Sequence, residues 1–530
     1  MANGSVHKKA EELKRQIIEH VDEQLTLFVK GLPNSALIRP NSSIGNMNSD
    51  TSRPNTPVEF AAESEDIYHI PIDKRRFRLK IFVRRESMLT DLLKESHVRS
   101  IYHIFAAVLI ILILNSWVHD LLDYGWPNLR LNMILWCFGK MPDVLFIWVA
   151  MFSSTLVAYA AFNVWSASPS TWFECVSWLV MYVAYLSMLF TYPITFIIMN
   201  DIPVASSMII VCEQVRMIMK IHAFIRENIP RAYRYHERVQ RIKEDMQKGV
   251  EYENNPRDTL HHCPDFSLFL YFLFAPTLVY RDSYPRTEKI NWSYVGSNFA
   301  QVFACLFYCN YLVTTFCIPA FQHFQPDHVT PRTFLSGMFS CILPASLVLL
   351  LGFFAILHSW LNAFAEMLRF GDRMFYKDWW NSTSFSGYYR TWNVVVHDWL
   401  YVYVYQDIMH LLQKDENTKN RTPAALSVFL LSALIHEYII GIALRFFYPV
   451  MFVQFFGFGV LLFFVTGKRE SRGWNVLMWL SLFLGTGLMM CLYSFEYFAR
   501  RNCSPHQNNL VDILLPRSLN CIPKPIIASE

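Results

Sequence analysis

The chain has 530 residues, of which 53% are hydrophobic, 16% are aromatic and only 17% are charged. Soluble globular domains carry about 25% charged residues, so this deficit indicates that lipid solvates much of the surface. The formal net charge of only +4 and the lack of a recognisable binding motif argue against a protein that binds DNA or RNA.

The first hundred or so residues are hydrophilic and contain no apolar core of the kind that a cleavable signal peptide needs. Apolar residues recur every three or four positions between Leu13 and Phe28, which predicts a helix with one apolar stripe. Such a stripe predicts a homo-oligomer, a dimer or a tetramer, although packing onto the protein's own body is the alternative. Residues 33–66 predict a disordered linker, so residues 1–70 form a separate N-terminal region.

A run of basic residues precedes the first long apolar segment. It comprises Lys74, Arg75, Arg76, Arg78, Lys80, Arg84 and Arg85. By the positive-inside rule this run should remain in the cytosol together with the N-terminus. A solvated charged surface is the simpler alternative.

Long apolar segments follow within residues 71–500, and a membrane helix needs about 20 apolar residues. The clear candidates are residues 102–120, 142–164, 174–199, 296–319, 334–356, 424–446, 449–466 and 474–496. Residues 204–228 are amphipathic and could span, lie in the interface or re-enter, and residues 391–411 could form a further embedded helix. We expect an all-α polytopic membrane protein with about nine transmembrane helices.

A polar tail, residues 501–530, follows the last apolar segment and contains Cys503 and Cys521. A disulfide between these cysteines is plausible if the tail is luminal, because the lumen is oxidising. A cytosolic N-terminus and a luminal tail require an odd number of crossings, which is consistent with nine.

One apolar segment carries a titratable pair, His436 and Glu437, at its centre. An ionised group there costs roughly a few kcal/mol, so such groups usually face a cavity or a partner. Ser432 lies four residues before His436 and shares its helix face. Burial favours the neutral imidazole that a general base requires. A catalytic histidine and a structural histidine that is hydrogen-bonded between helices both fit this segment.

Residues 358–406 combine aromatic side chains with many charged and amide groups, including FYKDWWN at residues 375–381 and YYRTWNVVVHDWL at residues 388–400. This mixture suits a ligand that carries adenine and phosphate, and the guanidinium of Arg390 is able to bind phosphate with two hydrogen bonds. An interfacial aromatic belt is the alternative, but it explains the tryptophans without explaining the charges.

The FYKDWWN motif, with His436 in a late apolar helix, closely resembles the membrane-bound O-acyltransferase family. The motif consists of Phe375, Tyr376, Lys377, Asp378, Trp379, Trp380 and Asn381. Over residues 80–525 the chain looks like the sterol O-acyltransferases within that family, whereas the related diacylglycerol acyltransferases have Glu at the place of Asp378. FLFAPTLVYRDSYPR at residues 272–286 and HEY at residues 436–438 add to this resemblance.

The resemblance implies roles for single residues. It implies that His436 is the catalytic histidine, that Asn393 is the second polar residue of the centre and that His97 lies near bound sterol. The residues expected to hold acyl-CoA are Arg390, Asn393, His397, Tyr405, Arg421 and Ser432. Two positions depart from the family, since Gly387 replaces a usual Asn and Arg421 replaces a usual Lys after a longer connection. Cys503 and Cys521 resemble a luminal disulfide of the family.

The resemblance implies transfer of a long-chain acyl group from acyl-CoA to the 3-hydroxyl of a sterol such as cholesterol, which yields a steryl ester and CoA. Neutral His436 would take the hydroxyl proton while Asn393 polarises the thioester carbonyl or orients the donor. No metal or cofactor is expected, since acyl-CoA is a co-substrate, and an acyl-enzyme on Ser432 or a cysteine stays open. The expected location is the endoplasmic reticulum membrane.

Two alternatives stay open at this point. The nearest is the same chemistry on diacylglycerol or a fatty alcohol. The other, from a different class, is a sterol-binding transporter or sensor in which His436 lines a pathway. Many transporters contain internal topological repeats, and none is visible in this sequence.

Overall fold

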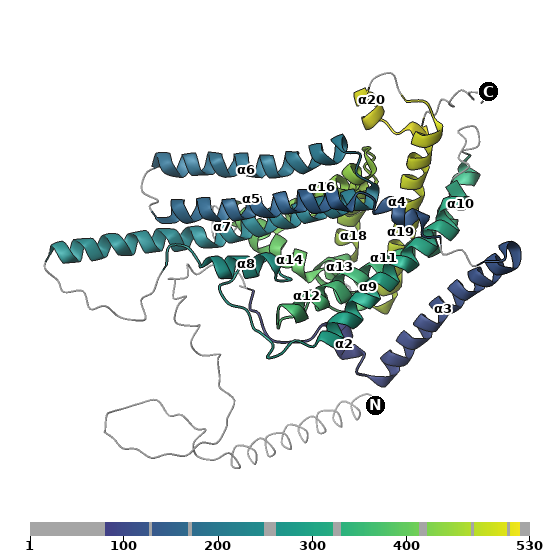
Figure 1. The fold of residues 1–530 in the computed structure, drawn as a ribbon, viewed down its shortest axis with the longest axis horizontal. Coiled ribbons are helices and arrows are strands. Elements are labelled where there is room, and N and C mark those ends of the chain that lie inside the picture. The colour runs from purple at the N-terminus through teal and green to yellow at the C-terminus, as the bar shows by residue number, and fades with distance from the viewer. Residues whose placement is uncertain are drawn as a thin grey trace, which may run out of the picture. The chain divides into compact units, whose positions relative to one another are not determined.

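A computed structural model describes residues 80–126, 130–167, 172–248, 261–321, 330–412, 421–467, 471–505 and 509–519. The predicted oligomerisation helix, the linker and Cys521 lie outside these ranges. The chain divides into two compact units between Arg76 and Phe77, and all the described residues belong to the second unit. In these residues the regular structure is helical, apart from two isolated bridges, which confirms the all-α class (Figure 1).

Seven helices of the described residues are long and apolar enough to cross a membrane. They are α3 (Ser96–Tyr124), α5 (Met141–Ala167), α6 (Trp172–Met199), α9–α10 (Trp292–Phe321), α11–α12 (Pro331–Met367), α16 (Arg421–Leu444) and α19 (Arg472–Asn502). Each overlaps a predicted segment, which confirms a multi-pass helical membrane protein. The eighth predicted segment is a shorter apolar helix, Val450–Thr466. The number nine stays a prediction.

Shorter helices complete the described part. They are α2 (Met88–Leu92), α4 (Asn132–Cys137), α8 (Phe266–Phe274), α13 (Phe385–Trp392), α14 (Val394–Leu400), α15 (Gln406–Leu412), α17 (Val450–Phe452), α18 (Gly459–Thr466) and α20 (Asn509–Leu514), with 3-10 turns η6 (Trp379–Asn381) and η9 (Arg517–Leu519). Four π-helical segments interrupt the helices of this part of the chain: η3 (Val313–Cys317), η5 (Phe354–Trp360), η7 (Tyr401–Tyr405) and η8 (Val453–Phe458).

The amphipathic segment 204–228 belongs to α7, a single helix of 44 residues (Val204–Gln247). It packs against α5, α6 and α16, and α5, α6 and α7 lie side by side in Figure 1. Polar residues on its buried face bind backbone carbonyls, as Lys220 does by donating to Phe272 and, at 2.7 Å, to Ala275. Because buried charges are tolerated when they are hydrogen-bonded, an amphipathic helix is able to pack in the interior.

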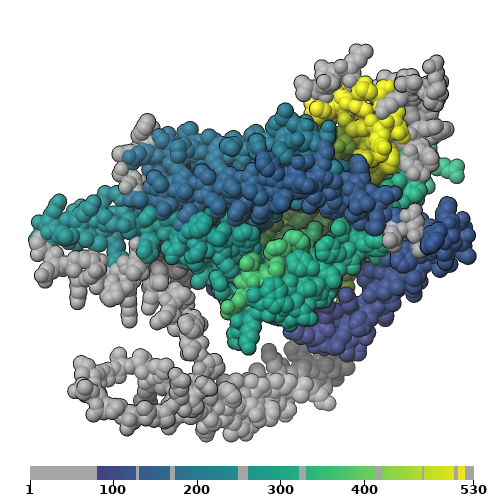
Figure 2. Space-filling model, viewed as in Figure 1, coloured from purple at the N-terminus to yellow at the C-terminus, as the bar shows by residue number. Residues whose placement is uncertain are grey.

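In contrast, α3 is poorly covered by the rest of the chain. Asp120 is its only buried residue, and α3 lies in purple along the edge of the molecule in Figure 2. The largest cluster of buried residues instead surrounds the segment 370–400 and includes side chains of α7, α8 and α11. This core supports the junction between α13 and α14, where several predicted site residues lie.

Candidate active site

The imidazole of His436 is held on two sides in the middle of α16. Its Nδ1 lies 2.7 Å from the backbone carbonyl oxygen of Ser432, one helical turn earlier. A carbonyl oxygen only accepts hydrogen bonds, so we infer that Nδ1 carries the proton and that Nε2 keeps its lone pair. The ring also stacks on Phe455 of η8, with centroids 4.6 Å apart and planes inclined by 28°. The imidazole is therefore held in the tautomer that exposes a basic nitrogen.

The two residues after His436 bind other helices. Glu437 accepts a hydrogen bond from the last backbone N–H of α17 at 3.0 Å and another from the hydroxyl of Tyr493 in α19 at 3.3 Å. Tyr438 donates to the side-chain oxygen of Gln214 in α7. These contacts determine how α16 is rotated about its axis, and so they determine the direction of His436.

Asn393 joins α13 to α14. Its side-chain oxygen accepts a hydrogen bond from the backbone N–H of Val396 at 3.1 Å and thereby caps the N-terminus of α14. Because this bond uses the amide oxygen, the NH2 group is the part of Asn393 that is available to donate. The N–H of Val394 donates to the carbonyl of Phe375 at 2.9 Å, which attaches the junction to the FYKDWWN motif. Among the described residues, no hydrogen bond joins Asn393 to His436.

His397, Tyr401 and Tyr405 form a ladder of rings along α14 and η7. The centroids of His397 and Tyr401 are 6.4 Å apart with planes at 11°, and those of Tyr401 and Tyr405 are 5.5 Å apart with planes at 15°. Residues four apart share one face of a helix. Two residues that were expected to hold acyl-CoA, His397 and Tyr405, therefore lie on the same face, with Tyr401 between them.

The helix α16 packs against η7, which brings further predicted residues to this ladder. Burial raises the pKa of Tyr405 above its ordinary value, and the positive charge of Arg421, the first residue of α16, opposes that rise. Ser432 and His436 lie further along the same helix.

Arg390 and Gly387 belong to α13. The Arg390 side chain is exposed in the last turn, where its Nε donates to the carbonyl of Ser386 at 3.0 Å. The N–H of Gly387 donates at 3.1 Å to Ser384, the N-cap residue. A Cβ at position 387 would lie only 3.2 Å from the Ser384 hydroxyl, so any side chain there would crowd the cap. The glycine at this position suits the local geometry of α13.

The FYKDWWN motif divides into buried and exposed side chains. The members that are no more than 2% exposed are Phe375, Tyr376 and Trp379. The exposed members are Lys377, Asp378 and Asn381, while Trp380 is half-buried. The Trp379 ring packs against Trp392 at 4.6 Å between centroids, and the Tyr376 hydroxyl lies 2.8 Å from Nδ1 of His358. These buried rings therefore pack against protein and support the α13–α14 junction, and a role of this region in binding adenine and phosphate stays a prediction.

Other predicted residues are not joined to this group. His97 lies exposed in the first turn of α3, and no hydrogen bond or ring contact of the described residues joins it to α14 or α16. Cys503 follows α19 and is disulfide-bonded. Its predicted partner, Cys521, lies outside the described residues, so this pairing stays a prediction.

Three residues near the site were not predicted from the sequence. Tyr401 was detectable, because a Tyr between His397 and Tyr405 at intervals of four residues predicts a shared helix face. Phe455 and Asp398 carry no such pattern. Their roles arise from contacts with His436 and Lys80, which lie 19 and 318 positions earlier in the chain.

Comparison with known proteins identifies the family of this chain. Residues 250–495, which include the FYKDWWN motif and His436, match the membrane-bound O-acyltransferase family. The chain is 45% identical to sterol O-acyltransferase 1 of Mus musculus over 449 residues, which is 83% of this chain and 79% of the mouse protein. It is 40% identical to sterol O-acyltransferase 2 of Rattus norvegicus over 519 residues, which is 97% of this chain and 90% of the rat protein. It is 43% identical to sterol O-acyltransferase 2 of Homo sapiens over 445 residues, which is 83% of this chain and 80% of the human protein. The chain belongs to the sterol O-acyltransferases of the membrane-bound O-acyltransferase family.

Proposed function

We infer that this protein transfers a long-chain fatty acyl group from acyl-CoA to the 3-hydroxyl of a sterol such as cholesterol, forming a steryl ester and CoA. The observation that carries this conclusion is the similarity to sterol O-acyltransferases, which extends over 83–97% of the chain. The matched family consists of membrane-bound O-acyltransferases, and the helices of this chain suit an enzyme whose sterol substrate is dissolved in lipid.

The proposed mechanism is direct acyl transfer with His436 as general base. As the sterol oxygen attacks the thioester carbonyl, Nε2 of His436 takes the hydroxyl proton. The carbon–sulfur bond then breaks, and the imidazolium returns the proton to the departing CoA thiolate, so that the histidine ends neutral. The hydrogen bond from Nδ1 to the Ser432 carbonyl supports this role, because it leaves Nε2 as the basic nitrogen.

Asn393 is proposed to act on the thioester as a hydrogen-bond donor. Its amide oxygen is engaged with the Val396 N–H, so its NH2 group is suited to polarise the thioester carbonyl or to orient the donor. A donor aimed at the developing oxyanion stabilises the transition state more than the ground state. The mechanism requires no metal or cofactor.

The acyl-CoA is proposed to bind along α13, α14, η7 and α16. The ring ladder supports this role for His397 and Tyr405, and the electrostatic effect of Arg421 on Tyr405 supports a cationic group beside it. The exposed guanidinium of Arg390 is suited to bind a phosphate of CoA. Ser432 would contact the acyl-CoA near His436, and sterol is proposed to bind near His97.

The cellular setting is also a proposal. We place the protein in the endoplasmic reticulum membrane, with the N-terminus in the cytosol and the tail in the lumen. An oxidising lumen would allow Cys503 and Cys521 to pair. The protein is proposed to form a homo-oligomer, a dimer or a tetramer, through its N-terminal stripe.

The test is acyl transfer by membranes that contain the protein or its His436→Ala variant. Labelled oleoyl-CoA is supplied with either cholesterol or diacylglycerol. We expect steryl ester from the intact protein and a loss of about 10²–10⁴-fold in kcat in the variant, at equal protein level. Near-normal activity of the variant would overturn the role of His436. Triacylglycerol in place of steryl ester would instead indicate a diacylglycerol acyltransferase, and no ester of either kind would favour a transporter or sensor.

A further inference from the structure

Residues 80–87, named the strap here, contain the end of the basic run, lead into α2 and bind the segment that precedes the FYKDWWN motif. The backbone N–H of Arg85 donates to the carbonyl of Gly371 at 2.9 Å, and the N–H of Arg373 donates to the carbonyl of Arg85 at 3.1 Å. The Arg85 guanidinium also pairs with the buried carboxylate of Asp372 at 2.7 Å. The strap is therefore attached to this loop by both backbone and side-chain contacts.

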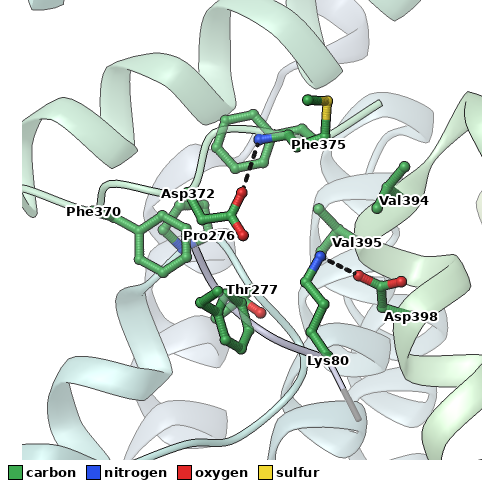
Figure 3. A pocket seen from close by; sticks show the side chains of 11 residues that line it. Lys80, Pro276, Thr277, Phe370, Asp372, Phe375, Val394, Val395 and Asp398 are labelled. Carbon is green, nitrogen blue, oxygen red and sulfur yellow. Dashed lines mark hydrogen bonds and ion pairs between the residues drawn. The ribbon is translucent and has the colours of Figure 1, made fainter. Parts of the chain in front are cut away.

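Lys80 extends this attachment to α14. Its Nζ lies 2.7 Å from Oδ2 of Asp398, and the two side chains are only 16% and 22% exposed. Figure 3 shows this pair at the wall of a small pocket, which is lined by residues of the strap, the 370–375 loop and the start of α14, together with Pro276 and Thr277. Water and salt screen such a sheltered pair less than a surface pair. The contact is thus able to hold α14 against the strap.

The carboxylate of Asp398 also faces a predicted acyl-CoA residue. Its Oδ1 lies 3.7 Å from Nδ1 of His397, while Oδ2 binds Lys80. Burial raises the pKa of Asp398, but His397 and Lys80 together outweigh it and bring the pKa below its ordinary value. The carboxylate is therefore ionised at neutral pH and is shared between the strap and the first ring of the ladder.

We propose that Lys80 is a positioning residue for acyl-CoA binding, which acts through Asp398 to orient His397 and the ring ladder. This inference rests on the acyl-CoA site proposed above. Lys80 touches no reacting group in the proposed mechanism, so its loss should weaken acyl-CoA binding and leave the chemical step almost unchanged. The expected signature is a higher KM for acyl-CoA with little change in kcat.

Arg84 provides a matched control from the same basic run. Its side chain is 60% exposed and lies 4.0 Å from Glu288, which is 85% exposed. An ion pair this exposed contributes little free energy to the folded structure. Replacing either Lys80 or Arg84 by Met removes one positive charge from the same flank of the first apolar helix. A purely topogenic role would therefore make the two variants alike.

The experiment uses the full chain in membranes and measures kcat and KM for oleoyl-CoA at saturating cholesterol. For Lys80→Met we expect a rise of about five- to tenfold in KM with kcat within about twofold of the intact protein. Lys80→Arg, which keeps the charge, should restore most of the affinity, and Arg84→Met should behave like the intact protein. Asp398→Asn should raise KM as Lys80→Met does, and combining the two changes should add little.

Equal KM values for Lys80→Met and Arg84→Met would overturn the proposal. So would a variant with both Lys80→Met and Asp398→Asn whose rise in KM is the product of the two single rises. If Lys80→Met is not recovered from membranes, Asp398→Asn keeps the basic run intact, and an unchanged KM in that variant would equally overturn it. His436→Ala, measured in the same membranes, tests the proposed catalytic role separately. The kcat of His436→Ala should fall whether or not Lys80 positions His397. Failure of the proposed catalytic role is therefore distinguishable from failure of the proposed positioning role.

Discussion

At the scale of single residues, the direction of His436 depends on groups that do not react. The Ser432 carbonyl holds Nδ1, and the Phe455 ring covers one face of the imidazole at 4.6 Å. Stacked aromatic pairs contribute about 0.5–1.5 kcal/mol beyond their buried area. The stack is thus strong enough to limit rotation of the ring but weak enough to remove without unfolding the helix.

We predict that Phe455→Leu lowers kcat by about three- to tenfold, because a ring that is free to turn spends less time aimed at the sterol hydroxyl. The control is Phe456→Leu, since the Phe456 ring stacks on Phe452, at 5.6 Å, and not on His436. Steady-state rates with saturating cholesterol and oleoyl-CoA measure the effect. An equal loss in both variants would mean that packing in η8, and not the stack on His436, determines the rate.

At the scale of elements, three π-helical segments bear site or supporting residues. Phe455 lies in η8, Tyr401 and Tyr405 lie at the two ends of η7, and His358, which contacts Tyr376, lies in η5. A π-helical segment is a local widening of an α-helix that is often found at functional sites. No residue pattern in YVYVY or FAILHSW predicted these segments, because they depend on the helices packed around them.

The ladder on α14 and η7 predicts a role for its central ring. Tyr401→Leu should raise the KM for oleoyl-CoA about two- to tenfold, because His397 and Tyr405 each lose a stacking partner. Tyr401→Phe keeps the ring, and no hydrogen bond of the described residues uses the Tyr401 hydroxyl, so this variant should retain the KM of the intact protein. A rise in KM for Tyr401→Phe as large as that for Tyr401→Leu would contradict the ladder and point to the hydroxyl.

At the scale of the whole molecule, contacts between distant segments constrain the number of crossings. The strap, before α3, binds residues 371–373, after α12, so both lie on one side of the membrane. Of the seven apolar helices, five lie between these points, and five crossings would place them on opposite sides. A further crossing is needed, and α7, with 44 residues, is long enough to supply it.

A similar constraint applies to the last third of the chain. Arg445, after α16, pairs with Asp201, which lies between α6 and α7, at 2.6 Å. Asn475, early in α19, donates to the carbonyls of Trp380 and Ser382, near the strap side. The helix pair α17–α18 must therefore return the chain across the membrane. If α7 and α17–α18 both cross, the seven apolar helices become nine crossings and the tail lies opposite the strap, and this count stays a prediction.

We predict from this arrangement which insertions reach the lumen. A glycosylation acceptor in a short flexible insertion beside Phe447 should be modified, whereas one beside Lys289 should not. If α7 and α17–α18 did not cross, these two outcomes would be reversed. Glycosylation is detected as a shift in electrophoretic mobility that an enzyme removing glycans reverses. An insertion in the tail, which both counts place opposite the strap, is the positive control.

The sequence by itself determined the fold class and the segments that form the seven apolar helices, and it placed His436 in the middle of one of them. Lipid solvation depends on local composition, so a run of apolar residues identifies a membrane helix without knowledge of its neighbours. The FYKDWWN motif was equally visible, and its resemblance to known proteins indicated the family. The sequence did not show which of its rings are buried, because the burial of Trp379 depends on Trp392 and Trp479.

Only the tertiary structure decided what the polar groups bind. The segment 204–228 was ambiguous because Lys220 is costly to bury until the carbonyls of Phe272 and Ala275 are placed beside it. The basic run gave no sign that Lys80 pairs with Asp398 while Arg84 stays in solvent. Lys80 and Asp398 are 318 positions apart in the sequence, and they come into contact only when the helices pack.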